Sequence, residues 1–255
     1  MKKIIGVLFC VVVPYLFYAQ EKGAVGIEIN SNLNLINTNE LNDYIDGVIS
    51  DWPDNMTLLN REKMTIGRDF GLSLNYQVAS LFNIGIYSKF SKGQSINDFR
   101  TIIPSEPIMG IPADTVYNGV TYTMTNTIIG IYSNFSINNM PFWPKENWLS
   151  RVESKVTIGV GYSYSRFINS GEPKLIKGFF GEVNPVSGIH LMGNLKIGYK
   201  LVKNPVFSSV GIQAGYQYLI TSHLKGESLI TFKENEAPRL NFSGLTAGIY
   251  LTFGK

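Results

Sequence analysis

The stretch KVTIGVGYSYSRF, residues 155–167, decides the fold because its side chains alternate between two classes at every step. One set of alternate positions is aliphatic or aromatic: Val156, Ile158, Val160, Tyr162 and Tyr164. The positions between them hold only threonine, glycine and serine. Successive side chains of a β-strand point to opposite faces, so the stretch predicts a strand with one apolar face. A shift by one residue would exchange the two faces, which specifies the register strongly.

Seven other segments alternate in the same way, and most are long enough to cross a bilayer as tilted strands. The eight predicted strands are residues 24–33, 68–79, 82–92, 122–138, 155–167, 190–202, 206–221 and 240–253. Proline falls mostly between them, as expected because strand interiors exclude it. We therefore predict an all-β fold, an eight-stranded antiparallel up-and-down transmembrane β-barrel.

The links between the predicted strands alternate in length. Residues 80–81 and 203–205 are short, and residues 139–154 form a medium link that carries Phe142, Trp143 and Trp148. The long links are residues 34–67, 93–121, 168–189 and 222–239. Membrane barrels have short periplasmic turns and long extracellular loops, so this alternation sets the orientation.

The same register gathers aromatic residues at two levels. Near the periplasmic boundary we expect Phe82, Phe135, Tyr199 and Phe253, and near the outer boundary Phe70, Phe90, Tyr164 and Tyr218. Two such girdles flank the apolar band of outer-membrane barrels. A soluble barrel would alternate too, but with its apolar face inward. Here the polar face is rich in glycine, serine, asparagine and tyrosine, which suits the narrow interior of eight strands.

The first residues predict export. Lys2 and Lys3 precede an apolar run over residues 4–17, which indicates a signal peptide spanning residues 1–19 and a barrel domain spanning residues 20–255. The alternative is an uncleaved anchor, although the run is short for a membrane helix. The single cysteine, Cys10, lies in this run. Loss of the leader would lower the net charge from +3 to about +1, with no basic block for a nucleic-acid partner.

The closing residues Thr246, Gly248, Leu251 and Phe253 resemble the C-terminal assembly signal of bacterial outer-membrane proteins, although Gly254 and Lys255 follow the aromatic residue. With the eight predicted strands, the chain resembles the OmpA/OmpX-like family of small outer-membrane barrels. This resemblance implies insertion by the barrel-assembly machinery, an environment of outer-membrane lipids and lipopolysaccharide, and no separate peptidoglycan-binding domain. It implies no particular activity, since one fold hosts many functions.

Four charged residues are predicted to point into the lumen by parity: Glu28, Lys89, Lys196 and Lys200. Because an unpaired buried charge is costly, we expect these groups to pair with opposite charges. Such a network either locks a solid barrel or lines a small polar conduit. Locking is the favoured interpretation because eight strands enclose so little space.

His190 is predicted at the outer end of the strand over residues 190–202. Some eight-stranded barrels are lipid A-modifying enzymes with a histidine and a serine at the outer rim, and Ser187 and Ser165 are candidate neighbours here. An active site would require a base within hydrogen-bond reach of its nucleophile. No triad spacing is visible, which favours a rim histidine without a catalytic role, as also for His223.

The long links carry the remaining unusual composition. Residues 34–67 carry apolar side chains at helical spacing, which predicts a short amphipathic helix: Leu41, Ile45, Val48, Ile49 and Trp52. The acids of this link could bind divalent cations or simply face solvent: Glu40, Asp43, Asp46, Asp51 and Asp54. Residues 102–112 are rich in isoleucine and proline, and could bind a partner or fold over the barrel mouth. No zinc-binding motif is present. Gly159-Val-Gly161 is not a nucleotide-binding loop, because no helix is expected after it.

These observations predict a small non-enzymatic integral protein of the outer membrane, with a structural role or a loop-mediated interaction with a surface or secretion partner. No cofactor is expected. Two alternatives remain open, namely a narrow passive channel and a lipid A-modifying enzyme.

Overall fold

The computed structural model describes residues 25–50, 54–103, 114–141, 143–144, 148–172, 181–201, 207–224 and 238–253. The predicted signal peptide lies outside the described residues, as do Asp51, Phe142 and the proline-rich residues 104–113.

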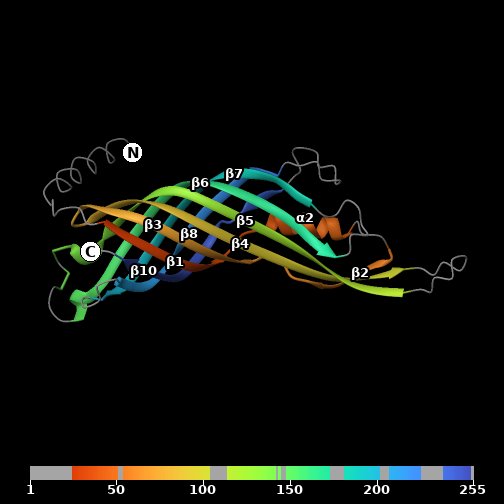
Figure 1. Ribbon diagram of the computed structural model, residues 1–255, viewed down its shortest axis with the longest axis horizontal. Coiled ribbons are helices and arrows are strands. Elements are labelled where there is room, and N and C mark those ends of the chain that lie inside the picture. Colours follow the sequence, from red (N-terminus) through yellow and green to blue (C-terminus); the bar gives the residue numbers. More distant parts are fainter. Residues whose placement is uncertain are drawn as a thin grey trace, which may run out of the picture.

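Eight long strands form the barrel: β1 (Val25–Leu35), β3 (Ile66–Ala79), β4 (Phe82–Ile103), β5 (Asp114–Ser136), β6 (Val152–Glu172), β7 (Gly181–Lys200), β8 (Phe207–His223) and β10 (Gly244–Phe253). Each pairs antiparallel with its neighbours, and β10 pairs with both β1 and β8, so the sheet closes on itself (Figure 1). The predicted fold is confirmed.

Smaller elements decorate the two ends of the barrel. At the end predicted to be extracellular, α2 (Asn39–Ser50) and β2 (Met56–Arg61) follow β1, and β9 (Arg239–Asn241) precedes β10. Two short 3-10 helices, η2 (Ile137–Asn139) and η3 (Trp148–Arg151), lie between β5 and β6. Among the described residues, no helix is both long and apolar enough to span a bilayer.

Several strands extend farther than predicted. Residues 93–103 and 114–121, which were expected in a loop, continue β4 and β5 as a paired ribbon beside β2 (Figure 1). Alternation persists there, with Ser95, Asn97 and Phe99 buried, but the outward positions are largely polar. The sequence prediction looked for an apolar outward face and therefore ended these strands too early.

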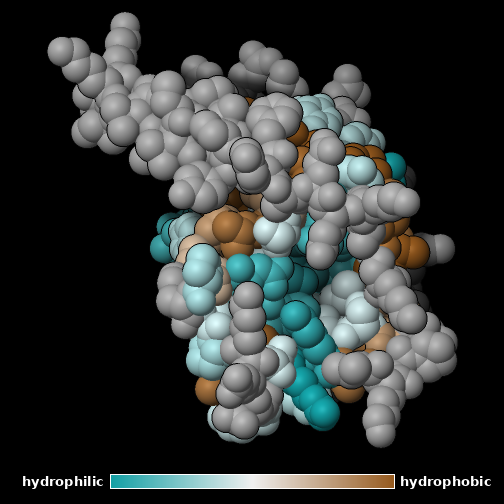
Figure 2. Space-filling view, turned by 90° about the vertical axis from the view of Figure 1, so that its left-hand side faces the viewer, coloured by the Kyte–Doolittle hydropathy of each residue, from teal (hydrophilic) through white to brown (hydrophobic). Residues whose placement is uncertain are grey.

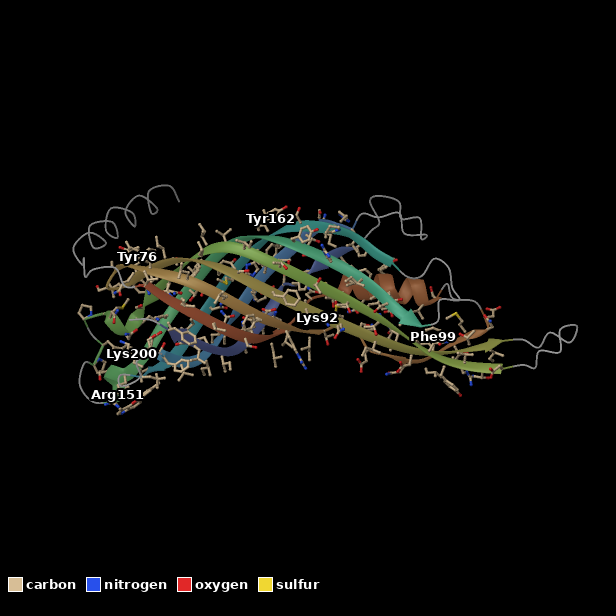
Figure 3. The ribbon with its side chains drawn as sticks, in the orientation of Figure 1. Tyr76, Lys92, Phe99, Arg151, Tyr162 and Lys200 are labelled. Atoms are coloured by element: carbon tan, nitrogen blue, oxygen red, sulfur yellow. The ribbon has the colours of Figure 1, made fainter. Side chains whose placement is uncertain are left out.

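The outward face of the barrel is apolar. Leu72, Ile86, Ile131 and Ile158 are between 49% and 64% exposed, and Tyr76 and Tyr162 project away from the ribbon (Figure 3). Viewed from the end where β10 terminates, hydrophilic residues occupy the centre and hydrophobic residues the periphery (Figure 2). A soluble protein does not expose a continuous apolar belt of this kind, whereas a barrel in a bilayer requires one. The protein is therefore a transmembrane barrel of the outer-membrane type.

Inward tyrosines lie against glycines on neighbouring strands. A Cβ atom at Gly130 would be 2.6 Å from Cε1 of Tyr87, and one at Gly85 would be 2.7 Å from Cε1 of Tyr132. Tyr250 takes the same place over Gly211. The glycines of the alternating pattern thus give three large rings room to fill the narrow lumen.

The outer mouth is filled by α2. Leu41 and Ile45 on this helix are fully buried. We call the apolar cluster that they enter the hydrophobic seal, and its main members are Leu41, Ile45, Met64, Phe99, Tyr122 and Phe242. The predicted amphipathic helix is thus present, and its apolar face packs into the barrel rather than along the membrane.

Candidate functional site

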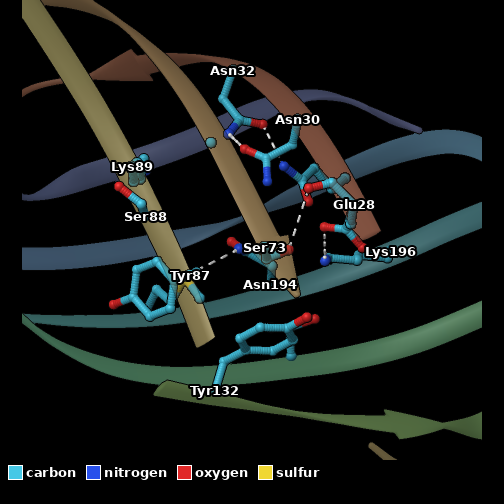
Figure 4. Close-up of a pocket in the computed structure, with 14 residues that line it drawn as sticks. Glu28, Asn30, Asn32, Ser73, Tyr87, Ser88, Lys89, Tyr132, Asn194 and Lys196 are labelled. Carbon is cyan, nitrogen blue, oxygen red and sulfur yellow. Dashed lines mark hydrogen bonds and ion pairs between the residues drawn. The ribbon is translucent and has the colours of Figure 1, made fainter. Parts of the chain in front are cut away.

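The strongest candidate site is a layer of charged and hydrogen-bonded side chains inside the barrel, below the hydrophobic seal. Lys196 Nζ lies 2.5 Å from Glu28 Oε1, and the two side chains are 4% and 2% exposed (Figure 4). Lys89 forms a second ion pair with the fully buried Asp69. Each lysine therefore meets an opposite charge out of contact with bulk water, as expected for buried ions.

A hydrogen-bonded chain continues from the second pair across the lumen. Lys89 Nζ donates to Gln217 Oε1 at 2.5 Å, and that oxygen lies 3.4 Å from His190 Nε2. His190 Nδ1 lies 2.7 Å from the hydroxyl of Tyr87. Gln217 Oε1 can only accept, so we assign the proton of a neutral His190 to Nε2, with the Tyr87 hydroxyl donating to Nδ1. The chain ties β3, β4, β7 and β8 together.

The structure brings three of the four predicted lumen charges into this layer. Glu28 and Lys196 pair with each other, and Lys89 pairs with Asp69. Lys200 lies apart, at the periplasmic end beside Asn138 and Trp143 (Figure 3). The predicted lumen set thus divides between two places in the barrel.

Sequence reasoning missed Asp69 and the polar partners of the histidine. The alternation contained the signal, since Asp69 stands between the outward residues Arg68 and Phe70 and must point inward. A further interior pair, Glu153 with Lys155, was missed on β6. Parity places such residues inside the barrel but does not say which of them meet.

His190 is not at the rim, which corrects the prediction. β7 begins at Gly181, so His190 lies well inside the barrel and is fully buried. Ser187 is three residues away on β7 and faces the opposite side of the sheet. Ser165 is buried and donates to Asn126 Oδ1 at 2.9 Å. Among the described residues, no hydrogen bond joins His190 to either serine.

The space left in the polar layer is small. A cavity of about 30 Å³ lies between the Glu28–Lys196 pair, Tyr87, Tyr132 and Asn194 (Figure 4). A cavity of this size holds one or two water molecules. Several buried polar atoms in the barrel have no protein partner, including the hydroxyls of Tyr132 and Tyr250, and ordered water would satisfy such groups.

The interior offers little to a metal ion. Within the described ranges, no three histidine, cysteine, aspartate or glutamate residues gather closely enough to bind one. The acids of α2 are spread along the helix, and Glu40 Oε2 accepts a bond from the backbone N–H of Arg239 at 3.2 Å. Asp46 binds Arg61 instead.

The helix is held over the lumen by Arg61 of β2. Its Nε donates to Asp46 Oδ1 at 2.5 Å, and its other nitrogens donate to the carbonyl of Asn42 and the amide oxygen of Asn97. Through its hydrogen bond and its charge, Arg61 holds the pKa of Asp46 below its ordinary value, and Lys63 adds to the effect. We call this contact the Arg61 latch.

The latch predicts a pH dependence for α2. Because the pKa of Asp46 is lower in the folded state, its ionised form stabilises the closed helix above about pH 4, and this contribution disappears as pH falls through the folded pKa. Backbone amides of α2 should therefore exchange faster in D46N than in wild type at pH 6. The two rates should converge as pH falls below the lowered pKa of Asp46. Mass spectrometry at matched pH measures both rates, and a constant ratio across this range would contradict the role of the carboxylate.

The predicted assembly residues all lie on β10, which closes the barrel. Thr246 and Gly248 face inward, while Leu251 and Phe253 belong to the outward set. Phe253 packs against Phe207 with ring centroids 5.0 Å apart. A Cβ atom at Gly248 would lie 2.1 Å from the carbonyl oxygen of Ser31, so the close approach of β1 and β10 requires glycine.

Comparison with known proteins gives likenesses in structure alone. No family model and no curated protein matches the sequence. The chain is similar to the outer membrane protein OprG of Pseudomonas aeruginosa, at 11% identity and a TM-score of 0.44, covering 93% of this chain and 99% of that one.

Two other solved structures are Ail, the attachment invasion locus protein of Yersinia pestis, in complex with sucrose octasulfate, and Neisserial surface protein A. They are 12% and 10% identical to this chain, each with a TM-score of 0.36, and each match covers 91% of this chain and 99% of the other. Likenesses this distant carry no argument about activity. The strand register of the chain itself establishes an eight-stranded barrel of the outer-membrane type.

Proposed function

We propose that this is a small non-enzymatic integral protein of the outer membrane. It acts through the lipid-facing surface of the barrel and through the strands that extend beyond the membrane, and not through its lumen. The observation that carries the proposal is the double closure of the interior. The polar layer leaves a cavity of about 30 Å³, and the hydrophobic seal covers it from the outside. Among the described residues, that packing supports a closed lumen over a solute path or a substrate pocket inside the barrel.

The external strands are the surface that we propose for interaction with a partner. The ribbon of β2, β4 and β5 extends beyond the other barrel strands (Figure 1). It exposes Leu59, Ile102 and Tyr117, which are 51%, 44% and 69% accessible. Apolar side chains exposed outside the membrane belt favour contact with another protein at the cell surface.

A planar lipid bilayer tests the closed lumen. We expect refolded protein to give no conductance steps at applied voltages of either sign, whereas a porin in the same apparatus gives stable openings. Folding is verified separately by the difference in migration between the unheated and the heated protein in a denaturing gel. Reproducible openings from inserted protein would favour the channel alternative.

The enzyme alternative makes a different demand. A lipid A-modifying enzyme needs its base to reach the outer leaflet, while His190 contacts Tyr87 and Gln217 in the interior. Under the proposed function, the mass spectrum of lipid A is the same in deletion and overexpressing cells. A shifted lipid A mass that follows expression would overturn it.

A further inference from the structure

Two positive charges stand side by side on the outward wall. Arg68 of β3 and Lys92 of β4 are direct partners in the antiparallel register, and both side chains are exposed. On the same lipid-facing side, one step closer to the periplasm, Phe70 pairs with Phe90. The sequence places both rings in the aromatic girdle at the extracellular boundary. The cations therefore lie at the outer edge of the apolar belt, where lipid headgroups begin.

Among the described residues, this pair has no protein counterion. Like charges directly opposite each other destabilise a sheet. The ion pairs formed among the described residues include neither Arg68 nor Lys92. Their neighbours across the flanking strands are Leu33 on β1 and Thr125 on β5, neither of which is acidic. The contrast with the interior is sharp, since Lys89 and Lys196 each have a carboxylate partner there.

A third cation extends the row. Arg166 of β6 is the register partner of Thr125 and is exposed, and its guanidinium lies 5.5 Å from the ring centroid of Tyr164. Strand by strand, the outward row therefore holds arginine, lysine, threonine and arginine just beyond the aromatic girdle. An anionic group would relieve the repulsion, and arginine and lysine are the side chains that bind phosphate oxygens most strongly.

We propose that Arg68 and Lys92, flanked by Arg166, bind the phosphate groups of a glycolipid in the outer leaflet, whose acyl chains lie along Phe70 and Phe90. The proposal rests on the proposed location of the protein in the outer membrane. It deepens that function by naming a lipid class and the part of the wall that holds it. Charge complementarity and the neighbouring apolar wall together favour a lipid phosphate over a free anion.

Native mass spectrometry of the folded barrel in detergent tests the site. The probe is purified lipid A, with dephosphorylated lipid A and inorganic phosphate as separate arms. We expect lipid A adducts on the wild type, and on the order of tenfold weaker binding for each phosphate contact removed in R68T/K92T. Dephosphorylated lipid A should bind weakly to both proteins.

The control is R100T, which removes one positive charge from the same face of β4, eight residues beyond Lys92. It should bind lipid A as the wild type does. Equal binding of lipid A to wild type and R68T/K92T, equal binding of the dephosphorylated lipid, or full displacement by millimolar phosphate would each overturn the proposal. A wild-type chain that fails to insert into membranes would instead refute the proposed function, so the two failures are distinguishable.

Discussion

Replacing Lys196 with methionine is expected to lower the free energy of unfolding by about 3–5 kcal/mol, because Glu28 would then be a buried charge without a counterion. Both side chains are almost fully removed from solvent, so bulk water cannot solvate the carboxylate in place of the lysine. Urea titration of the barrel in lipid vesicles, followed by tryptophan fluorescence, measures the change. K196M should unfold at a clearly lower urea concentration than wild type.

The double variant E28Q/K196M provides the control for this pair. It removes both charges together and should recover most of the lost stability, since the penalty arises from one unpaired ion rather than from the loss of an attraction. The substitution K200M changes a lysine of the same strand that lies at the periplasmic end, and should cost far less. Equal stability of K196M and wild type would show that Glu28 does not depend on the lysine as its counterion.

A valine at Gly130 is expected to destabilise the barrel by about 1–3 kcal/mol or more, through crowding of the lumen wall. Its Cβ atom would lie 2.3 Å from the carbonyl oxygen of Val160 and 2.7 Å from Cα of Gly161, and neither backbone atom can move without disturbing the ladder. The ring of Tyr87 blocks the remaining direction. The measurement is the urea midpoint together with the fraction of heat-modifiable protein after refolding.

Gly193 offers a matched control on the lipid face. A Cβ atom there meets nothing within 4 Å, so G193V should fold and unfold as the wild type does. Both substitutions add the same side chain to a strand of the same barrel, and only the side of the wall differs. If G193V were as destabilised as G130V, the effect would come from lost glycine flexibility and not from the packing against Tyr87.

The architecture was predictable because each strand residue faces either lipid or the lumen, and the polarity of its side chain indicates which of the two it faces. The alternation of apolar and polar side chains in residues 155–167 predicted the two faces of that strand. The same alternation identified all eight barrel strands. The ends of strands outside the bilayer were harder to place, because water on both sides removes the contrast. That is why β7 begins at Gly181, well before the predicted start at His190.

The interior contacts were only half predictable. Alternation gives the direction of Glu28 and Lys196, but their meeting across 168 positions depends on the stagger of the strands around the barrel. The hydrophobic seal was missed for a related reason. Ile128 and Leu219 point inward while Ile129 and Ile220 point outward, so both faces are apolar there and the alternation disappears.

The helix at the outer mouth also bears on the order of folding. It follows β1 and precedes every other barrel strand, whereas the ring closes only when β10 meets β1. The helix must therefore be in position when the last seam forms, or enter afterwards through the open end. In a barrel that closed without the helix, the apolar side chains of Ile128, Leu219 and Phe242 would be exposed to water. Correct assembly of the barrel is thereby coupled to the placement of one twelve-residue segment.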